Sequence, residues 1–367
     1  MGVARSKFNT VSVVAVATAV IAAGSLSACS RGDDTTAPAA GSTVTLVTHN
    51  SFAIDDDLAA AFEAETGFVL EVVLLGNAGA VANQIVLTAD SPLGDVVFGI
   101  DNTFASRVLN SAALDALPAA DVTALPTSIR DGVLADGALI PMTFSDVCLN
   151  TDVAWFQEHG ITEPETFEDL LHPRMGGLTV VLNPASSSPG LAFLLATISA
   201  FGDPTDSAVG GGWPDFWRAL RYNDAVVAAS WSEGYWGEFS GAGEGGTRPI
   251  IVSYSSSPAW TMSDDGTYST TRALLDTCFR QIEFAGVLAG AANLEGARAL
   301  VRFLAGIDFQ ASIPNTMFMN PADTSVPLPE DWARFAPLAP TTFEVSPDDI
   351  EANRERWIDE WTEIFGG

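Results

Sequence analysis

The sequence contains few basic residues. Lys and Arg together number 16 against 46 Asp and Glu, which gives a formal net charge of −30 at pH 7. Because phosphate binding needs clustered cations, this balance excludes nucleic acid as a partner. An acidic surface attracts cationic ligands, but the same carboxylates also maintain solubility or reflect adaptation to high salt. The net charge therefore identifies no ligand by itself.

Signatures of common enzymes are also missing. The chain has only three histidines, and it contains neither His-Glu-x-x-His nor Gly-x-Ser-x-Gly nor a cysteine cluster with metal-ligand spacing. His159 precedes Gly160 and His172 precedes Pro173, positions typical of helix ends and turns. We expect no catalysis, no cofactor and no protein-bound metal. An exported hydrolase with a serine that acts with His49 remains the enzymatic alternative, since catalytic triads are defined by geometry rather than by sequence order.

Internal repeats and a genuine nucleotide-binding loop are absent as well. No segment recurs at a fixed period, which argues against a solenoid. Residues 241–246 (GAGEGG) satisfy Gly-x-Gly-x-x-Gly, but a dinucleotide site needs that motif between a strand and a helix. Here the strand expected at 250–254 follows the glycines. We therefore predict a flexible loop.

The N-terminal residues have the features of an export signal. Two basic residues precede an apolar run over 11–23 that is too short for a permanent membrane span. The sequence Leu26-Ser27-Ala28-Cys29 then resembles the bacterial lipobox, in which the cysteine sulfur takes a diacylglycerol. We predict that 1–29 is a lipoprotein signal with Cys29 lipidated, and that 30–42, which is poor in large apolar residues, is a flexible tether. An ordinary secretory signal is the alternative; either way we expect the outer face of the cell membrane or the periplasm.

Only two cysteines remain after such processing. Cys148 and Cys278 lie 130 positions apart, and export favours a disulfide between them. Two separate buried thiols are the alternative, because the sequence gives no distance between the two residues. We predict the disulfide.

Apolar strands and amphipathic helices alternate from residue 43 onward. About 325 residues follow the tether, a length typical of about two domains. The predominantly apolar run over 68–75 predicts a strand buried on both faces. The alternation predicts an α/β fold with a mainly parallel sheet. Expected strands cover 44–47, 68–75, 95–100, 139–149, 178–182 and 250–254, and expected helices open near residues 55, 77, 103, 166, 191 and 346.

A turn rich in serine follows the strand expected at 178–182. Ser186, Ser187 and Ser188 stand directly before a helix, where backbone N–H groups and hydroxyls can hold a phosphate or a hydroxyl. Simple capping of that helix is the alternative, but it needs one serine and not three. We predict a ligand contact at this turn.

Two segments combine aromatic side chains with small polar residues. Trp231 and Glu233 belong to the first, and Tyr254, Ser257 and Trp260 belong to the second. A flat cationic heteroaromatic ligand needs stacking surfaces and a nearby carboxylate. Each aromatic side chain taken alone also fits ordinary core packing, so their adjacency to Ser and Glu carries the prediction of a binding site.

Several short motifs, in order along the chain, resemble the thiamine-binding proteins of bacterial ABC importers. The resemblance runs from about Thr43 to Trp361. It rests on Asn50-Ser51-Phe52, Gly99-Ile100-Asp101-Asn102, Asn183-Pro184, Ser187-Ser188-Pro189-Gly190-Leu191, Trp231-Ser232-Glu233, Ser253-Tyr254, Ser257-Pro258-Ala259, Trp357-Ile358 and Glu360-Trp361.

The resemblance implies a two-lobed periplasmic-binding-protein-like fold, with a ligand cleft between lobes that are joined by crossing strands. Lobe 1 would comprise 43–142 plus 277–320, and lobe 2 would comprise 143–276 plus 321–367. Closure of the lobes over the ligand would present a monomer to a membrane permease of the ABC type. The implied function is delivery of thiamine or its phosphate esters, without catalysis.

The resemblance also implies a set of site residues. The ring system would pack against Trp231, Tyr254 and Trp260, the serine turn would face the ligand tail, and Glu233 or Asp146 would supply the counter-charge. The other implied ligand-binding residues are His49, Asn50, Asp101, Ser257 and Phe318.

Some positions depart from the family pattern. His49 and Asn50 stand where relatives have Tyr and Asp, Ala78 and Thr143 replace acidic residues, and Phe318 replaces a Trp. These departures leave two alternative ligands open on the same scaffold, a polyamine and ferric iron. Iron capture uses clustered tyrosine oxygens, and the four tyrosines here include no adjacent pair.

Overall fold

The computed structural model describes residues 41–204, 211–242 and 245–366. The predicted signal, Cys29 and all but the last two residues of the predicted tether lie outside this range. Two residues of the predicted glycine loop, 243 and 244, do so as well. No helix in the described part of the chain is both long and apolar enough to cross a membrane.

The described strands form one mixed sheet in the order β2-β1-β3-β9-β5-β8-β6-β7. The strands β2, β1 and β3 run parallel and form what we call the first half of the sheet, and β8, β6 and β7 run parallel and form the second half. The strands are β1 (Thr43–Thr48), β2 (Val69–Leu74), β3 (Val96–Asp101), β4 (Leu114–Asp115), β5 (Ile140–Asp152), β6 (Thr179–Leu182), β7 (Val226–Ala228), β8 (Ile250–Tyr254), β9 (Thr271–Leu288) and β10 (Asn320–Pro321).

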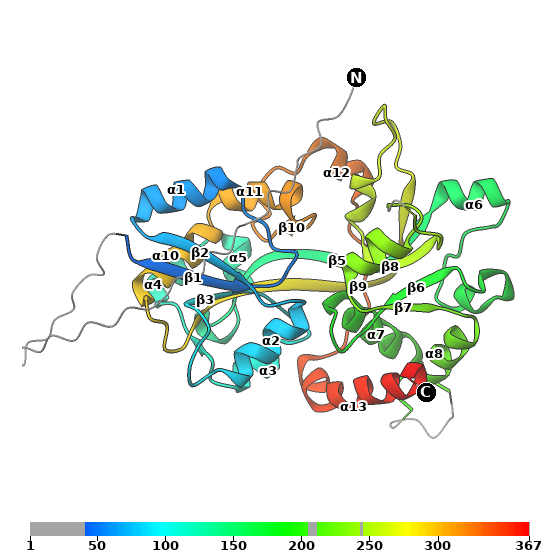
Figure 1. Cartoon of the computed structure of the whole chain (residues 1–367), viewed down its shortest axis with the longest axis horizontal. Coiled ribbons are helices and arrows are strands. Elements are labelled where there is room, and N and C mark those ends of the chain that lie inside the picture. The colour runs from blue at the N-terminus through cyan, green and yellow to red at the C-terminus, as the bar shows by residue number, and fades with distance from the viewer. Residues whose placement is uncertain (1–40, 205–210, 243–244, 367) are drawn as a thin grey trace, which may run out of the picture. The chain divides into compact units, whose positions relative to one another are not determined.

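Two long antiparallel strands connect the halves. β5 has 13 residues and β9 has 18, and they pair with each other over most of the length of β5. β9 also pairs with β3 of the first half, while β5 pairs with β8 of the second half. Figure 1 shows both strands running from one half to the other. The crossing strands therefore carry the chain between two otherwise separate parallel units.

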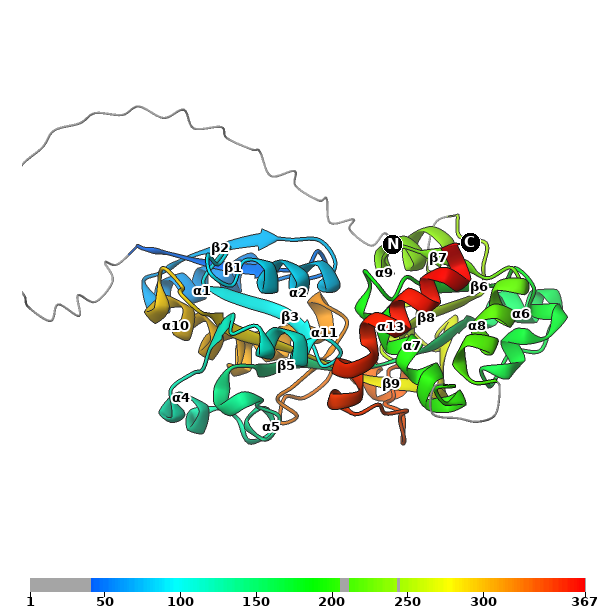
Figure 2. The same cartoon turned by 90° about the horizontal axis from the view of Figure 1, so that it is seen from below.

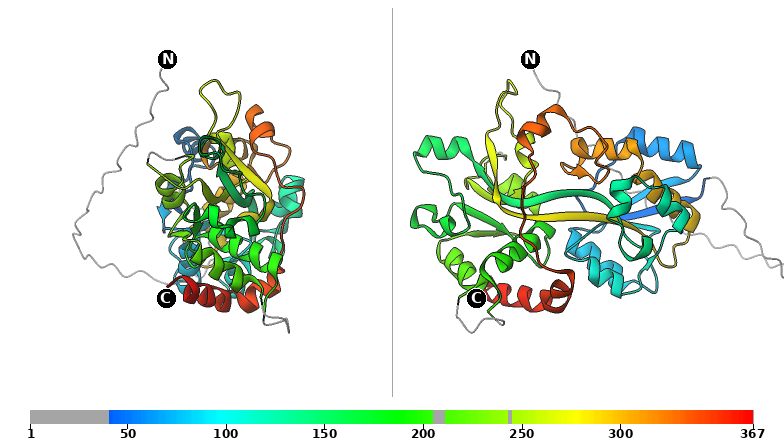
Figure 3. Two further views of the ribbon diagram at one scale, coloured as in Figure 1. Left: turned by 90° about the vertical axis from the view of Figure 1, so that its right-hand side faces the viewer. Right: turned by 180° about the vertical axis from the view of Figure 1, so that it is seen from behind.

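Helices cover each half. α1, α2, α3 and α10 pack on the first half, α7 and α8 pack on the second, and α13 packs on α8 (Figure 3). The α-helices are α1 (Asp56–Thr66), α2 (Ala78–Leu87), α3 (Ala105–Asn110), α4 (Ala119–Ala124), α5 (Thr127–Asp131), α6 (Val153–His159), α7 (Ser188–Phe201), α8 (Trp213–Tyr222), α9 (Trp231–Glu233), α10 (Leu294–Leu304), α11 (Ile307–Thr316), α12 (Glu330–Phe335) and α13 (Pro347–Gly366). Short 3-10 turns occupy Ala135–Gly137, Glu168–Leu171, Pro173–Met175 and Ser257–Trp260, and a π turn occupies Gly234–Glu238.

The structure confirms the α/β class, the expected strands and the expected helices, except that a 3-10 turn at Glu168–Leu171 stands where a helix was expected near residue 166. A second expectation is wrong: β2 is not buried on both faces, because it forms the edge of the sheet. Val69 is 42% exposed and Leu74 is 53% exposed. The apolar run predicted a strand correctly, but its place in the sheet depends on pairing that local sequence does not encode.

The crossing strands are cross-linked beside the second half. Cys148 of β5 and Cys278 of β9 form a disulfide with a Cα–Cα separation of 4.2 Å. Two positions further toward the first half, Asp146 forms an ion pair with Arg280, and the Arg280 Nη2 group lies 3.0 Å from Asp146 Oδ2. The backbone N–H of Ala339 donates to the same carboxylate. These contacts hold the C-terminal segment and both crossing strands together.

Candidate ligand-binding site

Three polar side chains lie abreast on neighbouring strands where the halves meet. Glu283 of β9 is paired in register with Asp101 of β3 on one side and with Thr143 of β5 on the other. Directly paired residues point to the same face of a sheet. Thr143 Oγ1 donates to Glu283 Oε2 over 2.8 Å, and His49 Nε2 lies 3.5 Å from Glu283 Oε1. All four side chains are buried.

The environment of Asp101 favours its protonated form. Oδ1 accepts hydrogen bonds from the backbone N–H and the hydroxyl of Thr103, at 2.7 and 2.5 Å. Oδ2 is buried and has no hydrogen-bond partner among the described residues. Burial raises the pKa of Asp101, and the charge of Glu283 adds to this, while the neighbouring hydroxyls of Ser188 and Thr103 oppose it.

The environment of Glu283 has the opposite effect. Burial by itself raises the pKa of Glu283, but the electrostatic contact with His49, together with the hydrogen bond from Thr143, outweighs burial and lowers the pKa. The pKa values of two neighbouring carboxyl groups are thus shifted in opposite directions. Pairs of carboxyl groups with oppositely shifted pKa values are common at functional sites.

Tyr254 neighbours both Trp231 and the group that we call the acidic cluster, which comprises Asp101 and Glu283 with His49 and Thr143. Its hydroxyl accepts a hydrogen bond from Gln281 Nε2 over 3.3 Å. Burial raises the pKa of Tyr254 well above its ordinary value, and the charges of Glu283 and Asp101 raise it further, so the phenol stays neutral and can donate. Gln281 and Glu283 are two positions apart on β9 and therefore share a face.

Trp231 is fixed beside Tyr254. Its indole Nε1 donates to Ser253 Oγ over 2.9 Å, and that hydroxyl lies 2.8 Å from the hydroxyl of Ser257. The buried ring of Tyr235 stacks on one face of the indole with a centroid distance of 4.6 Å. The Tyr254 ring lies 6.3 Å away at a 48° tilt. The hydrogen bond and the stack fix the orientation of the indole before any ligand binds.

A second aromatic pair consists of Trp260 and Phe318. Their ring centroids lie 3.9 Å apart at an angle of 69°, and Trp260 is 42% exposed. Phe318 has φ of +60°, a conformation that residues other than glycine rarely adopt. Its carbonyl accepts a hydrogen bond from Ser256 Oγ over 2.6 Å, which helps to hold this strained backbone.

The serine turn begins α7 and approaches the acidic cluster. Ser187 Oγ accepts from Gly190 N over 3.4 Å as the N-cap, and Ser186 Oγ donates to the carbonyl of Ala229 over 2.8 Å. Ser188 is buried, its hydroxyl has no hydrogen-bond partner among the described residues, and it neighbours Asp101. One serine therefore caps the helix, and another points toward the acids of the first half.

Three predicted site residues lie apart from these groups. Asn50 is exposed on the loop after β1. Asp146 is fully buried in its ion pair with Arg280, so its charge is already compensated. The carboxylate of Glu233 accepts from the backbone N–H of Ala229, at the start of α9. The structure thus brings His49, Asp101 and Tyr254 together around Glu283, with Ser188 beside Asp101. It also places Trp231 and Ser257 beside Tyr254.

Sequence reasoning missed Gln281, Glu283 and Tyr235. The signal for the first two was present, because polar residues two apart interrupt the apolar run of β9. Since β9 itself was not predicted, that alternation was not recognised.

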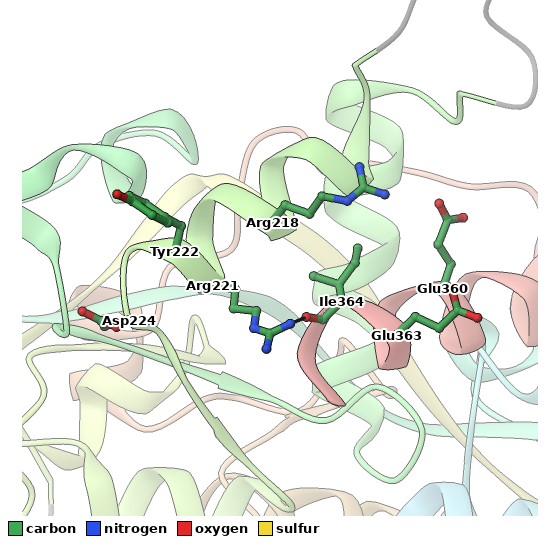
Figure 4. Close-up of a pocket in the computed structure, with 7 residues that line it drawn as sticks. All are labelled: Arg218, Arg221, Tyr222, Asp224, Glu360, Glu363 and Ile364. Carbon is green, nitrogen blue, oxygen red and sulfur yellow. Dashed lines mark hydrogen bonds between the residues drawn. The ribbon is translucent and has the colours of Figure 1, made fainter. Parts of the chain in front are cut away.

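A surface pocket of about 730 Å³ lies elsewhere, between the C-terminal ends of α8 and α13 (Figure 4). Its cations are engaged locally: the Arg221 guanidinium donates to the carbonyl of Ile364, and Arg218 pairs with Asp215. It is lined by Arg218, Arg221, Tyr222, Asp224, Glu360, Glu363 and Ile364. This pocket contains none of the predicted site residues. In the part of the chain that the structure describes, no three His, Cys, Asp or Glu side chains are grouped as metal ligands.

We predict that Asp101→Asn stabilises the protein at neutral pH. A carboxyl group whose pKa is higher in the folded chain contributes stability at low pH, and this contribution is lost as the pH rises through the folded-state pKa. Asn retains the acceptor for Thr103 and removes the buried charge. Urea unfolding should show a gain of about 1 kcal/mol at pH 7 that shrinks toward pH 4.

Asp95→Asn is the matched control. Both oxygens of Asp95 accept backbone N–H groups, from Thr45 and from Asn293, each over 2.8 Å. An amide NH₂ would face one of these donors, so this variant should be less stable than the parent. Equal losses in both variants at pH 7 would contradict the role assigned to Asp101.

Residues 57–340 match the family described as Bacterial extracellular solute-binding protein. The chain is 27% identical over 329 residues to the Thiamine-binding periplasmic protein of Escherichia coli (strain K12), covering 87% of this chain and 92% of that protein. It is also 27% identical over 328 residues to the protein of the same name from Brucella suis biovar 1 (strain 1330), covering 87% and 91%.

Solved structures share the fold. The structure titled "Periplasmic thiamin binding protein" matches with a TM-score of 0.74 at 23% identity, covering 88% of this chain and 96% of that chain. Iron-bound HitA from Pseudomonas aeruginosa matches with a TM-score of 0.64 at 17% identity, covering 88% and 99%. These likenesses confirm the predicted two-lobed, periplasmic-binding-protein-like fold. Because the family match spans most of the sequence, the chain belongs to the bacterial extracellular solute-binding proteins.

Proposed function

We propose that this protein binds thiamine or a phosphate ester of thiamine outside the cytoplasm and delivers it to an ABC importer. One observation carries the proposal: Asp101 and Glu283 lie side by side on paired strands, and Tyr254, which is hydrogen-bonded to Gln281 two positions from Glu283 on β9, lies beside the oriented indole of Trp231. The thiazolium ring has a fixed positive charge and a flat face. A carboxylate and an indole are the groups that such a cation needs. The names of the relatives from Escherichia coli and Brucella point to the same ligand.

The counter-charge belongs to the acidic cluster in this proposal. Asp146 and Glu233 were the nearest candidates from sequence, but Arg280 compensates the first and a backbone N–H engages the second. Glu283 has a lowered pKa, and its contact with His49, at 3.5 Å, is longer than the two hydrogen bonds that Arg280 donates to Asp146, so we assign the negative charge to Glu283. The serine turn, with Ser186, Ser187 and Ser188, would hold the hydroxyl or phosphate tail at the N-terminus of α7.

We further propose that lobe 1 comprises 43–142 plus 277–320 and lobe 2 comprises 143–276 plus 321–367. These boundaries assign the first half of the sheet to lobe 1 and the second half to lobe 2, with β5 and β9 as the connection. The ligand would bind between the lobes and favour the closed state through its contacts with both. The closed monomer would then dock on a permease, and the chain itself would catalyse no reaction.

Trp231→Ala should weaken thiamine binding about tenfold or more. Loss of the indole face removes apolar burial and a cation–π attraction of about 0.5–2 kcal/mol, and about 1.4 kcal/mol corresponds to a factor of ten. Trp231→Phe should recover part of the affinity, because it restores a stacking face. Calorimetric titration with thiamine, its monophosphate and its diphosphate measures these effects.

Tyr222→Ala serves as the control in that titration, because Tyr222 is 92% exposed and lines the separate pocket on α8. This variant should bind like the parent. If the parent gives no heat with any of the three compounds but a clear signal with spermidine or ferric ion, the rival ligand replaces thiamine.

We also propose that Cys29 carries the lipid anchor, from the lipobox in the sequence. Cys29→Ala should release the protein from the membrane fraction or leave the signal uncleaved. Fractionation and gel migration compare the variant with the parent. Identical behaviour of the two proteins would show that an ordinary secretory signal is at work.

A further inference from the structure

Helix α13 bridges the two halves of the molecule. Its C-terminal part packs on α8, where the rings of Trp361 and Trp217 lie 5.7 Å apart in an edge-to-face arrangement. Its N-terminal part contacts α3 on the first half. Figures 1 and 2 show α13, in red, running along the second half and starting beside the first. The contacts that this one helix makes with both halves therefore depend on how the two halves are arranged.

Polar contacts define the junction between α13 and α3. Glu351 accepts from Ser106 Oγ over 2.7 Å and from Asn110 Nδ2 over 3.3 Å. One turn further along α13, Glu355 pairs with Arg107 over 3.4 Å. These groups are largely exposed, so each contact contributes little by itself. They nevertheless fix the register of one helix against the other.

A buried cation lies at the centre of the same junction. Arg354 is only 6% exposed, and its guanidinium carbon lies 5.0 Å from the centre of the Phe104 ring. Its side chain makes no hydrogen bond to another described residue. Burial lowers the pKa of Arg354, and the charge of Arg107 adds to this, while Glu351, Glu355 and Asp101 oppose it. A buried arginine is costly unless aromatic and acidic neighbours compensate it, and here those neighbours lie on both halves.

The ring beneath Arg354 is part of the first half's side of the ligand site. Phe104 follows the turn that begins at Asp101, and its N–H donates to the carbonyl of Asp101 over 3.0 Å. On its other side the ring lies so close to Gly79 that a Cβ there would be 3.2 Å from it. The same Cβ would lie 3.4 Å from the carbonyl of Ser186, in the serine turn of the second half. Phe104 thus contacts Arg354 on α13 and lies beside Gly79, which faces the serine turn.

We propose that Arg354 is a positioning residue that latches α13 onto Phe104 when the lobes are closed. Arg354 makes no hydrogen bond to the acidic cluster. It raises ligand affinity by raising the fraction of molecules in which the lobes are closed. Ligand held between closed lobes leaves only after the latch opens. The effect of Arg354 on ligand affinity rests on the proposed function. Its effect on the shape of the ligand-free protein does not.

Arg354→Met tests the latch, because methionine keeps an apolar stem and removes the charge. Small-angle scattering of the ligand-free variant should give a larger radius of gyration than the parent. Stopped-flow displacement of thiamine should give a dissociation rate about three- to thirtyfold faster, which corresponds to a lost interaction of about 0.6–2 kcal/mol. Glu351→Ala, at an exposed position, should shift both measurements in the same direction by less.

Arg356→Met is the matched control on the same helix. Arg356 pairs with Asp203 and Glu360, away from α3, so its loss should alter neither the radius of gyration nor the dissociation rate. If Arg354→Met lowers the melting temperature but leaves both measurements at parent values, Arg354 is only structural and the latch is refuted. If no variant binds thiamine, the proposed ligand fails, and the scattering comparison still decides the latch.

Discussion

The antiparallel pairing of β5 with β9 is the constraint on which the rest of the structure depends. These strands bring residues near 143 beside residues near 283, and β9 in turn meets β3. That register puts Thr143, Glu283 and Asp101 abreast. It also sets the ion pair of Asp146 with Arg280 and the disulfide between Cys148 and Cys278. The acidic cluster and the connection between the halves are therefore consequences of one set of backbone hydrogen bonds.

Burial of carboxyl groups at this crossing has an energetic cost that a cation can offset. An isolated charge loses most of its hydration when it is buried, and Asp101 responds by favouring its protonated form while Glu283 relies on His49 and Thr143. A ligand with a fixed positive charge would add compensation for the Glu283 carboxylate without needing a proton. Because the serine turn and Trp231 belong to the second half, such a ligand would also draw the halves together.

Local signals explain most of what could be predicted from sequence. The apolar runs of β1 and β3 are encoded within a few residues, and both strands appear where expected. β9 was missed because its pattern mixes polar and apolar residues, and only its long-range partners explain them. The edge position of β2 was missed for the same reason. Asp146 was assigned the counter-charge because register is invisible in sequence, and Glu283 was overlooked because its strand was not predicted.

The identity of a naturally retained ligand tests the central claim most directly. Native mass spectrometry of the protein purified from its own host weighs the ligand without a prior choice of compound. If the crossing strands form a site for a flat organic cation, the bound mass should equal that of thiamine or one of its phosphate esters. A bound mass that equals a polyamine, ferric iron or a neutral solute would contradict the claim.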